Sequence, residues 1–487
     1  MSYLRGPDRN ETQLLPASVS DYVPTNSPLW FLDEYVEGLD FAALGFKHAK
    51  PAGVGRPSYH PADLLKLYIY GYLQRIRSSR RLEAEASRNL ELIWLIRGIR
   101  PDFKTIANFR KDNRDVFKKL LKQFNLLCRK LELFGAELVA IDGSKFKAVN
   151  NSRRYYTKER LEELTALVER HIERYVCELD RHDAEAAGVS GVPSREDLEQ
   201  KVALLKERKG RYAELLGELT ENEEQSLSLT DADARKMKGP HGFVVGYNVQ
   251  LAVDAKHDLI VTTDVVQAAV DSAQLSSMAI AAKKELGVET VQVVADTGYH
   301  EARQLEQCEQ ENIEAYVPES EGTSGKGKDG ADIFPKQMFQ YAPETDTYTC
   351  PAGQTLTRKG SDENHGRKRF VYGNHSACVR CAMRDKCTTA KHRQIRRLVN
   401  EAVVERTAAR LAKRPEMCAV RKETVEHVFG SIRNWNHDVF LLRGLAKVRA
   451  EFNLSALVYN LRRVINLIPL QDLLKRLAEL RPQLKAA

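Results

Sequence analysis

The sequence predicts an α/β fold in which a mixed sheet is flanked by helices and preceded by an all-α N-terminal domain. Two short apolar runs rich in β-branched residues, at 138–141 and 290–295, each lead into an aspartate, which is typical of buried strands that end at a sheet edge. Apolar residues at intervals of three and four predict the helices. From 137 to 317 the expected order is strand, strand, strand, helix, strand, helix, strand, which indicates one mixed sheet.

The size and charge of the chain favour several domains and a polyanionic partner. A chain of 487 residues is too long for one compact core. Its formal net charge is +8, and basic residues gather at 74–130 and 354–397. Such patches favour nucleic acid over the alternative of a solvated basic surface. No window approaches the roughly 18 consecutive apolar residues of a membrane span, and no signal-peptide core follows the N-terminus, so we expect a cytoplasmic protein without membrane contact.

Residues 1–132 are predicted to form a helical DNA-binding domain. A turn at Pro101 leads into a basic helical segment that includes Thr105, Asn108 and Arg110. This segment is a candidate recognition helix, with its polar and basic side chains exposed. An ordinary helical bundle with a wet basic face is the alternative.

The sheet is expected to be assembled from separated segments. One interruption is a hairpin of two charged amphipathic helices, whose charges indicate a solvated face. The other is a basic segment that contains four cysteines. The predicted boundaries after the N-terminal domain are 133–150 for the first core strand, 151–235 for the helical hairpin, 236–318 for the remaining core strands and helices, 319–400 for the four-cysteine insertion, 401–470 for the core helix with Glu426, and 471–487 for a C-terminal helix or tail.

The four cysteines predict a structural zinc site. Cys378 and Cys381 have the C-x₂-C spacing, and Cys350 and Cys387 supply two further sulfurs. Four thiolates can close a tetrahedron around Zn²⁺ and hold together a loop-rich segment with little hydrophobic core. We favour this over the alternative of unliganded thiols, because a cytosolic chain seldom uses cysteines as a disulfide framework.

Three carboxylates are candidates for a second metal site. Strands placed side by side would bring Asp142 and Asp296 together at the carboxyl edge of the sheet. On an α-helix, Lys422, Glu426 and Arg433 would project from one face. A surface salt-bridge ladder is the alternative for that helix alone. Oxygen ligands favour Mg²⁺ or Mn²⁺ over Zn²⁺.

These motifs resemble those of the DDE transposases of bacterial insertion sequences. Asp142-Gly143-Ser144-Lys145 resembles the first motif of that family, 294–299 the second and 425–430 the third. The Tyr-x₂-Arg-x₃-Glu-x₆-Lys signature is matched in part, because Lys422 stands for the Arg, Arg433 for the Lys, and an alanine occupies the Tyr position. The basic N-terminal helices and the four-cysteine insertion resemble one branch of the family.

The resemblance implies an RNase H-like mixed sheet, interrupted by the helical hairpin and by a zinc-ribbon-like insertion. The catalytic residues would be Asp142, Asp296 and Glu426, which would hold two Mg²⁺ or Mn²⁺ ions. The enzyme would cut double-stranded DNA at terminal inverted repeats and join the freed 3′-OH ends to target DNA. A homodimer on paired ends is expected by symmetry, acting at the bacterial nucleoid. The expected DNA contacts are Lys422, Arg433, Lys145, Thr105, Asn108, Arg110, Arg367, Lys368 and Arg369.

Three other functions remain open from the sequence. A metal-dependent nuclease on the same fold would share the three carboxylates and lack strand transfer. A domesticated DNA-binding regulator would keep them for structural reasons only. A scaffold in which the aspartates merely cap helices and turns would leave the order of the carboxylates and the basic segments as coincidence.

Overall fold

The computed structural model of the chain describes residues 18–51, 57–150, 154–184, 195–221, 226–239, 242–319, 333–364 and 366–485. The chain divides into two compact units. The first unit consists of Met1–Gly135, Gly143–Ala269 and His427–Ala487, and the second of Ala136–Asp142 and Val270–Glu426. Asp142 and Glu426 are therefore the last residues of the two segments that make up the second unit.

The first unit begins with helices, as the sequence predicts. Pro61 opens one of them at a position where its missing N–H costs no hydrogen bond. Asp102 caps another by accepting the N–H groups of Lys104 and Thr105. The helices are α1 (Leu29–Glu37), α2 (Phe41–Leu44), α3 (Pro61–Leu73), α4 (Ser79–Arg88), α5 (Leu90–Leu95), α6 (Phe103–Asp112) and α7 (Val116–Lys130).

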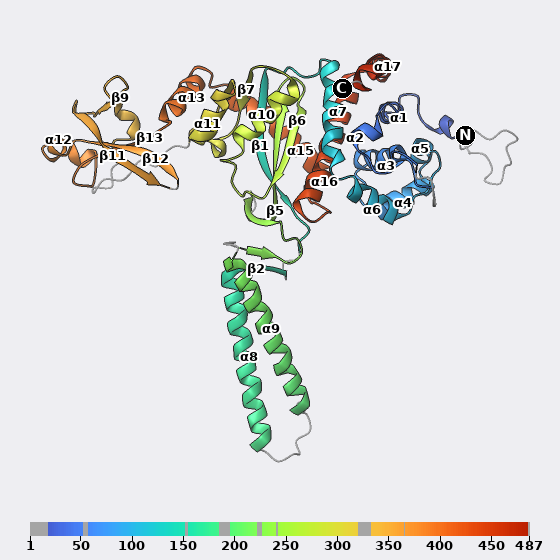
Figure 1. Cartoon of the computed structure of the whole chain (residues 1–487), viewed down its shortest axis with the longest axis horizontal. Helices are drawn as coiled ribbons and strands as arrows, with labels where there is room; N and C mark the ends of the chain where they lie inside the picture. The colour runs from blue at the N-terminus through green and yellow to red at the C-terminus, as the bar shows by residue number, and fades with distance from the viewer. Residues whose placement is uncertain are drawn as a thin grey trace, which may run out of the picture. The chain divides into compact units, whose positions relative to one another are not determined.

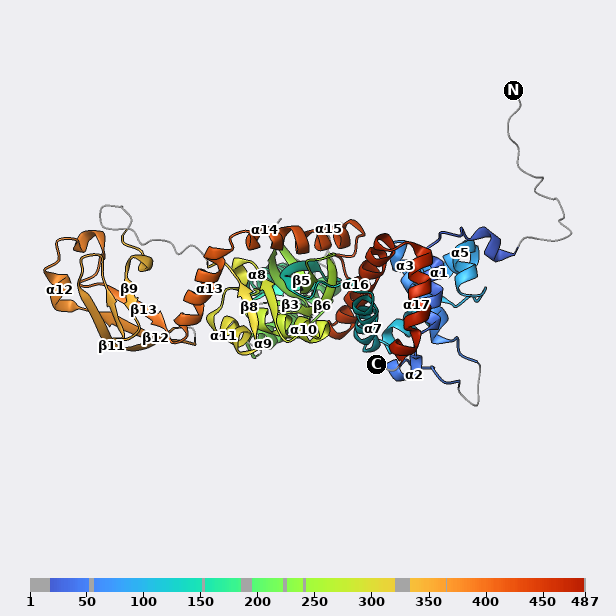
Figure 2. The same cartoon turned by 90° about the horizontal axis from the view of Figure 1, so that it is seen from above.

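Helix α16 (Leu445–Leu467) joins these helices to the strands of the same unit, and α17 (Leu470–Lys485) follows it. Helix α16 packs beside α7 and β6 (Figure 2). The buried Asn125 side chain of α7 donates to the backbone carbonyls of Ile260 and Val261, and Asn460 of α16 donates to the side-chain oxygen of Asn125 at 2.9 Å. These buried amide groups have hydrogen-bond partners only when α7, β6 and α16 are packed in this arrangement.

The strands of the first unit are β4 (Arg235–Gly239), β5 (Gly242–Asp254) and β6 (Leu259–Val266), paired antiparallel in the order β4, β5, β6. The second and third strands of the predicted order are present as β5 and β6. The second half of β1 (Leu138–Lys147) also lies in this unit, next to β5. Gly246 makes this approach possible, because a Cβ at that position would lie 1.9 Å from the carbonyl oxygen of Phe146.

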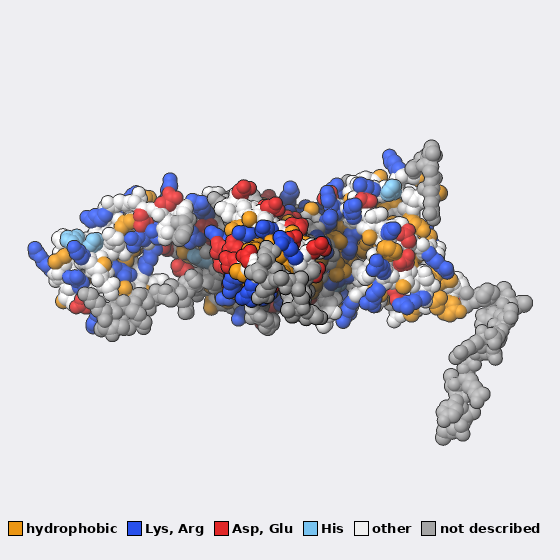
Figure 3. Space-filling view, turned by 90° about the horizontal axis from the view of Figure 1, so that it is seen from below, with side chains coloured by type: hydrophobic (Ala, Val, Ile, Leu, Met, Phe, Trp, Pro, Cys, Tyr) orange, Lys and Arg blue, Asp and Glu red, His pale blue; other side chains and the backbone are white. Residues whose placement is uncertain are grey.

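The predicted helical hairpin is confirmed. Helices α8 (Lys158–Ala184) and α9 (Arg195–Glu221) run side by side as an antiparallel pair (Figure 1). The short strands β2 (Tyr155–Thr157) and β3 (Ser226–Ser228) pair at its base, which the sequence had not indicated. Acidic and basic side chains are intermixed on the face drawn in Figure 3.

In the second unit, β7 (Val291–Val294) lies between the first half of β1 and β8 (Ile313–Tyr316), and both pairings are parallel. Helix α10 (Leu275–Leu286) precedes β7, and α11 (Ala302–Gln310) connects β7 with β8. The prediction that β1 ends at Asp142 is wrong, because the strand continues to Lys147. The inward alternation continues with buried Ser144 and Phe146, so the glycine at 143 lies in the strand and makes no turn.

The four-cysteine insertion contains a sheet, so the prediction of a loop-rich segment with little core is wrong. Its core is a cluster of Phe339, Tyr348, Leu356, Tyr372 and Ile395. The antiparallel order is β13-β12-β11-β10-β9. The strands are β9 (Gln340–Ala342), β10 (Thr347–Thr349), β11 (Thr355–Asn364), β12 (Arg367–Gly373) and β13 (Gln394–Leu398), with α12 (His375–Val379) after β12.

Helices α13 (Glu401–Lys413) and α14 (Met417–Arg421) lead back to the core, and α15 (His427–Asn434) lies beyond the boundary between the units. Between α14 and α15 the residues Lys422–Glu426 form a π-helix. None of the described helices combines the length and apolar character that a membrane-spanning helix needs.

We expect Gly246→Ala to destabilise the first unit by about 3 kcal/mol or more, because backbone atoms of β1 would have to move away from β5. Gly217→Ala is the control, since nothing lies within 4 Å of a Cβ at that position of α9. The control should be neutral or stabilising by about 0.5–1 kcal/mol. Thermal unfolding followed by circular dichroism measures both, and equal melting temperatures for the two variants would contradict the close approach of β1 and β5.

Candidate functional site

The first two predicted carboxylates follow the paired residues of two neighbouring strands. The parallel register of β1 and β7 pairs Ala140 with Val294 and ends there. Asp142 lies two residues further along β1, and Asp296 lies two residues beyond Val294, where β7 ends. The Asp142 side chain is 15% exposed. That these two carboxylates lie at one place stays a prediction, which the parallel pairing supports.

Asp296 is held by the turn that follows β7. Its side chain caps the 3₁₀-helix Thr297–Tyr299, and its Oδ1 accepts the N–H of Gly298 at 2.9 Å. Tyr299 is fully buried and anchors the turn. Burial also lowers the pKa of His300, which follows it, so this imidazole is neutral at neutral pH and adds no cation beside Asp296.

Glu426 lies at the end of the π-helix, and this corrects the geometry expected from an α-helix. A π-helix makes hydrogen bonds from residue i to i+5, one residue more than an α-helix. Arg421, five residues earlier, donates a hydrogen bond to Glu426, and the placement of Lys422 on the same face stays a prediction. Lys422 is exposed.

Arg421 bridges two of the predicted carboxylates. Its Nη1 donates to Oδ2 of Asp142 and its Nη2 to Oε1 of Glu426, each at 2.9 Å. The Arg421 side chain is 11% exposed and that of Glu426 54%. A planar guanidinium with several donors is suited to hold two carboxylates at once. Sequence reasoning missed Arg421, because the only signal for it is the π-helix.

The donor set fits a hard divalent cation. The three predicted ligands offer only carboxylate oxygens, which Mg²⁺ and Mn²⁺ prefer. A cation, the Arg421 guanidinium, already lies between Asp142 and Glu426. Across the residues that the structure describes, no group of three or more His, Cys, Asp or Glu side chains is arranged closely enough to enclose a metal ion. The side chains would therefore have to draw together when a metal binds.

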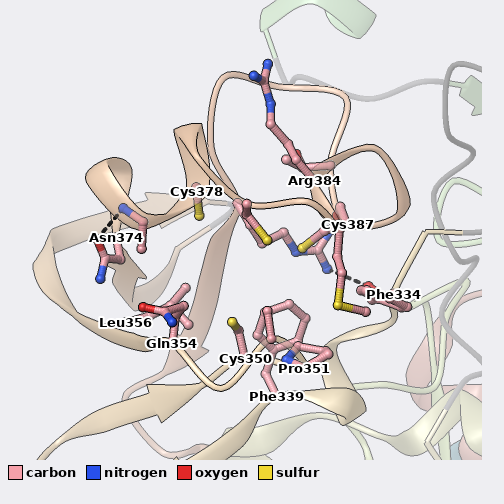
Figure 4. A pocket seen from close by; sticks show the side chains of 16 residues that line it. Phe334, Phe339, Cys350, Pro351, Gln354, Leu356, Asn374, Cys378, Arg384 and Cys387 are labelled. Atoms are coloured by element: carbon pink, nitrogen blue, oxygen red, sulfur yellow. Dashed lines mark hydrogen bonds between the residues drawn. The ribbon is translucent and has the colours of Figure 1, made fainter.

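The four cysteines of the insertion line one pocket. Figure 4 shows Cys350, Cys378 and Cys387 around it, and Cys381 also lines it. Two tight turns place these thiols, since the N–H of Gly353 donates to the Cys350 carbonyl at 2.8 Å and the N–H of Cys381 to the Cys378 carbonyl at 3.3 Å. Burial raises the pKa of the Cys387 thiol, and the other three thiols lie close enough to raise it further.

The basic side chains of the insertion divide into engaged and accessible ones. Arg369 makes two hydrogen bonds to Asp362, at 2.8 and 3.1 Å. Arg367 and Lys368 are exposed and line a groove between β12 and α11. Of the three predicted DNA contacts here, Arg367 and Lys368 are accessible and Arg369 is held by its carboxylate partner.

The predicted recognition helix is α6, and only part of it is exposed. Asn108 is exposed, whereas the Thr105 hydroxyl donates to the Asp102 carboxylate at 2.7 Å. The prediction of an exposed Arg110 is wrong. Its side chain is 7% exposed and its guanidinium lies 5.5 Å from the centre of the Tyr68 ring. An arginine can stack on aromatic rings in the interior of a helical domain, and α-helical spacing alone does not reveal this.

Two further predicted DNA contacts lie next to the first motif in the first unit. Arg433 on α15 is exposed and donates a hydrogen bond to the hydroxyl of Ser144. Lys145 is half-buried. The first and third motifs are therefore joined by a direct contact, which the sequence had not indicated.

Comparison with known proteins gives two family matches. A model described as a transposase domain (DUF772) matches residues 17–112, and a model described as a transposase DDE domain matches residues 349–465. The second match includes Glu426, while Asp142 and Asp296 lie outside both. No curated protein matches the chain.

A solved structure with some likeness is the cryo-EM structure of a piggyBac transposase synaptic complex with hairpin DNA. It is 8% identical, the alignment covers 95% of this chain and 80% of that one, and the TM-score is 0.29. A TM-score this low carries no argument about the fold. The two family matches, at the N-terminal helices and around Glu426, agree with the motifs read from the sequence, and they support assignment of the chain to the DDE transposases.

Proposed function

We propose that this transposase cuts DNA at the terminal inverted repeats of an insertion sequence and joins the freed 3′-OH ends to target DNA. Asp142, Asp296 and Glu426 would be the catalytic carboxylates on an RNase H-like sheet. The observation that carries this proposal is the parallel pairing of β1 with β7, because Asp142 and Asp296 each follow the last pair, Ala140 with Val294, by two positions. The bond from Arg421 to both Asp142 and Glu426 supports the third member.

The three carboxylates would hold two Mg²⁺ or Mn²⁺ ions, which when bound supply Lewis-acid activation of the attacking oxygen and stabilisation of the leaving one. The protein's own contribution is to position the ligands. The Gly298 N–H orients one oxygen of Asp296. Arg433 connects the helix after Glu426 to Ser144, two residues beyond Asp142, so motifs one and three are fixed relative to each other.

DNA binding would be divided between the two basic parts of the chain. We propose that residues 1–132 read the terminal repeats, with Asn108 and Thr105 on α6, and that the insertion at 319–400 contacts phosphates through Arg367 and Lys368. Lys145, Lys422 and Arg433 would contact the DNA nearest the carboxylates. The remaining predicted boundaries, 133–150, 151–235, 236–318, 401–470 and 471–487, belong to the same proposal.

A zinc ion held by Cys350, Cys378, Cys381 and Cys387 would stabilise the insertion as a zinc-ribbon-like module. The shared pocket and the mutual influence of the thiols support this. Thiolates are the usual ligands of structural zinc. Because two ends must be held in one complex for joining, we propose a homodimer on paired ends.

Nicking of a labelled terminal repeat by the full chain tests the catalytic assignment. In Mg²⁺, Asp142→Asn and Asp296→Asn should bind the repeat as the wild type does and nick it at least about 100-fold more slowly, since even the outer-shell partners of metal ligands are worth 10–100-fold. EDTA should abolish nicking by the wild type.

The exposed Asp472 on α17 provides the control, and Asp472→Asn should nick normally. Wild-type nicking rates in either active-site variant would remove that residue from the site. Nicking without joining to a target duplex would favour a nuclease. Binding of the repeat without nicking, in Mg²⁺ or in Mn²⁺, would favour a regulator.

Metal analysis tests the zinc module. The purified chain should contain about one Zn²⁺, and Cys378→Ser should lose it and lower the melting temperature of the insertion. Cys418→Ser is the matched control, because Cys418 is exposed on α14 and outside the four-cysteine pocket. Full zinc content in Cys378→Ser, or a wild-type chain purified without zinc from zinc-supplemented cells, would contradict the assignment.

A further inference from the structure

Arg421 occupies the position between two of the carboxylates that the proposed function gives to a metal. Its two bonds, to Oδ2 of Asp142 and Oε1 of Glu426, both measure 2.9 Å. Arg421 and Asp142 are both largely buried, at 11% and 15% exposed. Water therefore screens this pair only weakly, and the guanidinium is held firmly against the first carboxylate.

Carboxylates that approach one another repel, and they stay ionised together when a cation lies between them. The guanidinium of Arg421 is such a cation, and its Nη1 and Nη2 groups each donate to one of the two carboxylates. A divalent ion held between Asp142 and Glu426 would compete with the guanidinium for the oxygens that Arg421 bonds. Two cations this close to each other would also repel, so binding of the metal opposes binding of the guanidinium.

We propose that Arg421 is an internal counter-ion, which holds Asp142 and Glu426 ready before the metal binds and which the metal must displace. The inference rests on the proposed function, because it takes these carboxylates as metal ligands. Arg421 is a positioning residue in this account. It also sets a threshold, because part of the free energy of metal binding is used to break its two bonds.

Of two adjacent cations, only Arg421 is seen to bond the carboxylates. Lys422 carries the same charge one residue further along and is exposed, whereas Arg421 donates to both Asp142 and Glu426. Lys422→Gln is therefore a matched control for Arg421→Gln. Both variants remove one positive charge from the same segment, and only one removes the bridge.

Binding of Mn²⁺ to the full chain without DNA, followed by the electron paramagnetic resonance signal of free Mn²⁺, tests the proposal. Arg421→Gln should lower the Kd for Mn²⁺ by about three- to tenfold relative to Lys422→Gln, as expected when one largely buried ion pair and one pair with an exposed carboxylate no longer have to be broken. Arg421→Lys keeps the positive charge but loses the planar pair of N–H donors, so its Kd for Mn²⁺ should lie between those of the wild type and Arg421→Gln.

The melting temperature provides a second readout. In EDTA, Arg421→Gln should melt at a lower temperature than Lys422→Gln, because the bridge between Asp142 and Glu426 is lost. Addition of Mn²⁺ should raise the melting temperature of Arg421→Gln by more than that of Lys422→Gln. If Arg421→Gln does not fold, Arg421→Lys carries the test. An unchanged or higher Kd in the variant that folds would overturn the proposal.

Asp142→Asn separates this inference from the proposed function. If it weakens Mn²⁺ binding while Arg421→Gln and Lys422→Gln bind alike, the carboxylate site stands and the counter-ion role is refuted. If Asp142→Asn binds Mn²⁺ as the wild type does, the metal site at Asp142 and the counter-ion role are both refuted.

Discussion

The parallel pairing of β1 with β7 is the constraint on which the proposed active site depends. Most of the paired residues are apolar, and Asp142 and Asp296 each follow the last pair, Ala140 with Val294, by two positions. Because side chains alternate between the two faces of a strand, a slip of one residue would turn an aspartate to the opposite face. The continuation of β1 through Asp142 to Lys147 adds a second support, since the strand is held beside β5 after the carboxylate.

Repulsion between carboxylates is the cost of this arrangement. The chain offsets it with Arg421, which the π-helix turns toward Asp142 and Glu426. π-helical turns are rare and occur often at functional sites. Here the π-helix separates Arg421 from Glu426 in the sequence, and Arg421 is the cation that bonds both Asp142 and Glu426.

Much of the architecture could be predicted from the sequence. The β-branched runs before Asp142 and Asp296 and the long amphipathic helices of the hairpin have periodicities that few other structures share. The resemblance to DDE transposases supplied the order of the three carboxylates, and the family matches support the class of enzyme. The positions of Cys350, Cys378, Cys381 and Cys387 around one pocket also follow the expectation from their spacing.

Other features could not be predicted, for physical reasons. A π-helix differs from an α-helix by a shift of backbone hydrogen bonds that leaves no trace in apolar periodicity, so Arg421 was missed. Arg110 looks exposed by helical spacing, but its burial depends on Tyr68 from another helix. The sheet of the insertion could not be predicted because its core consists of single residues from separate segments, three of them aromatic. Arginines over its rings, such as Arg358 at 3.4 Å from the centre of the Phe370 ring, make the sequence look more polar than the fold.

We propose that Asp142, Asp296 and Glu426 form one cation site, in which Arg421 bridges two of the carboxylates until a metal ion displaces it. The most direct test is anomalous scattering from crystals of the full chain soaked in Mn²⁺. The account predicts an anomalous peak bounded by oxygens of Asp142 and Asp296, with Glu426 turned toward it and Arg421 moved off both carboxylates. Mn²⁺ bound elsewhere, with Arg421 still bridging Asp142 and Glu426, would contradict it.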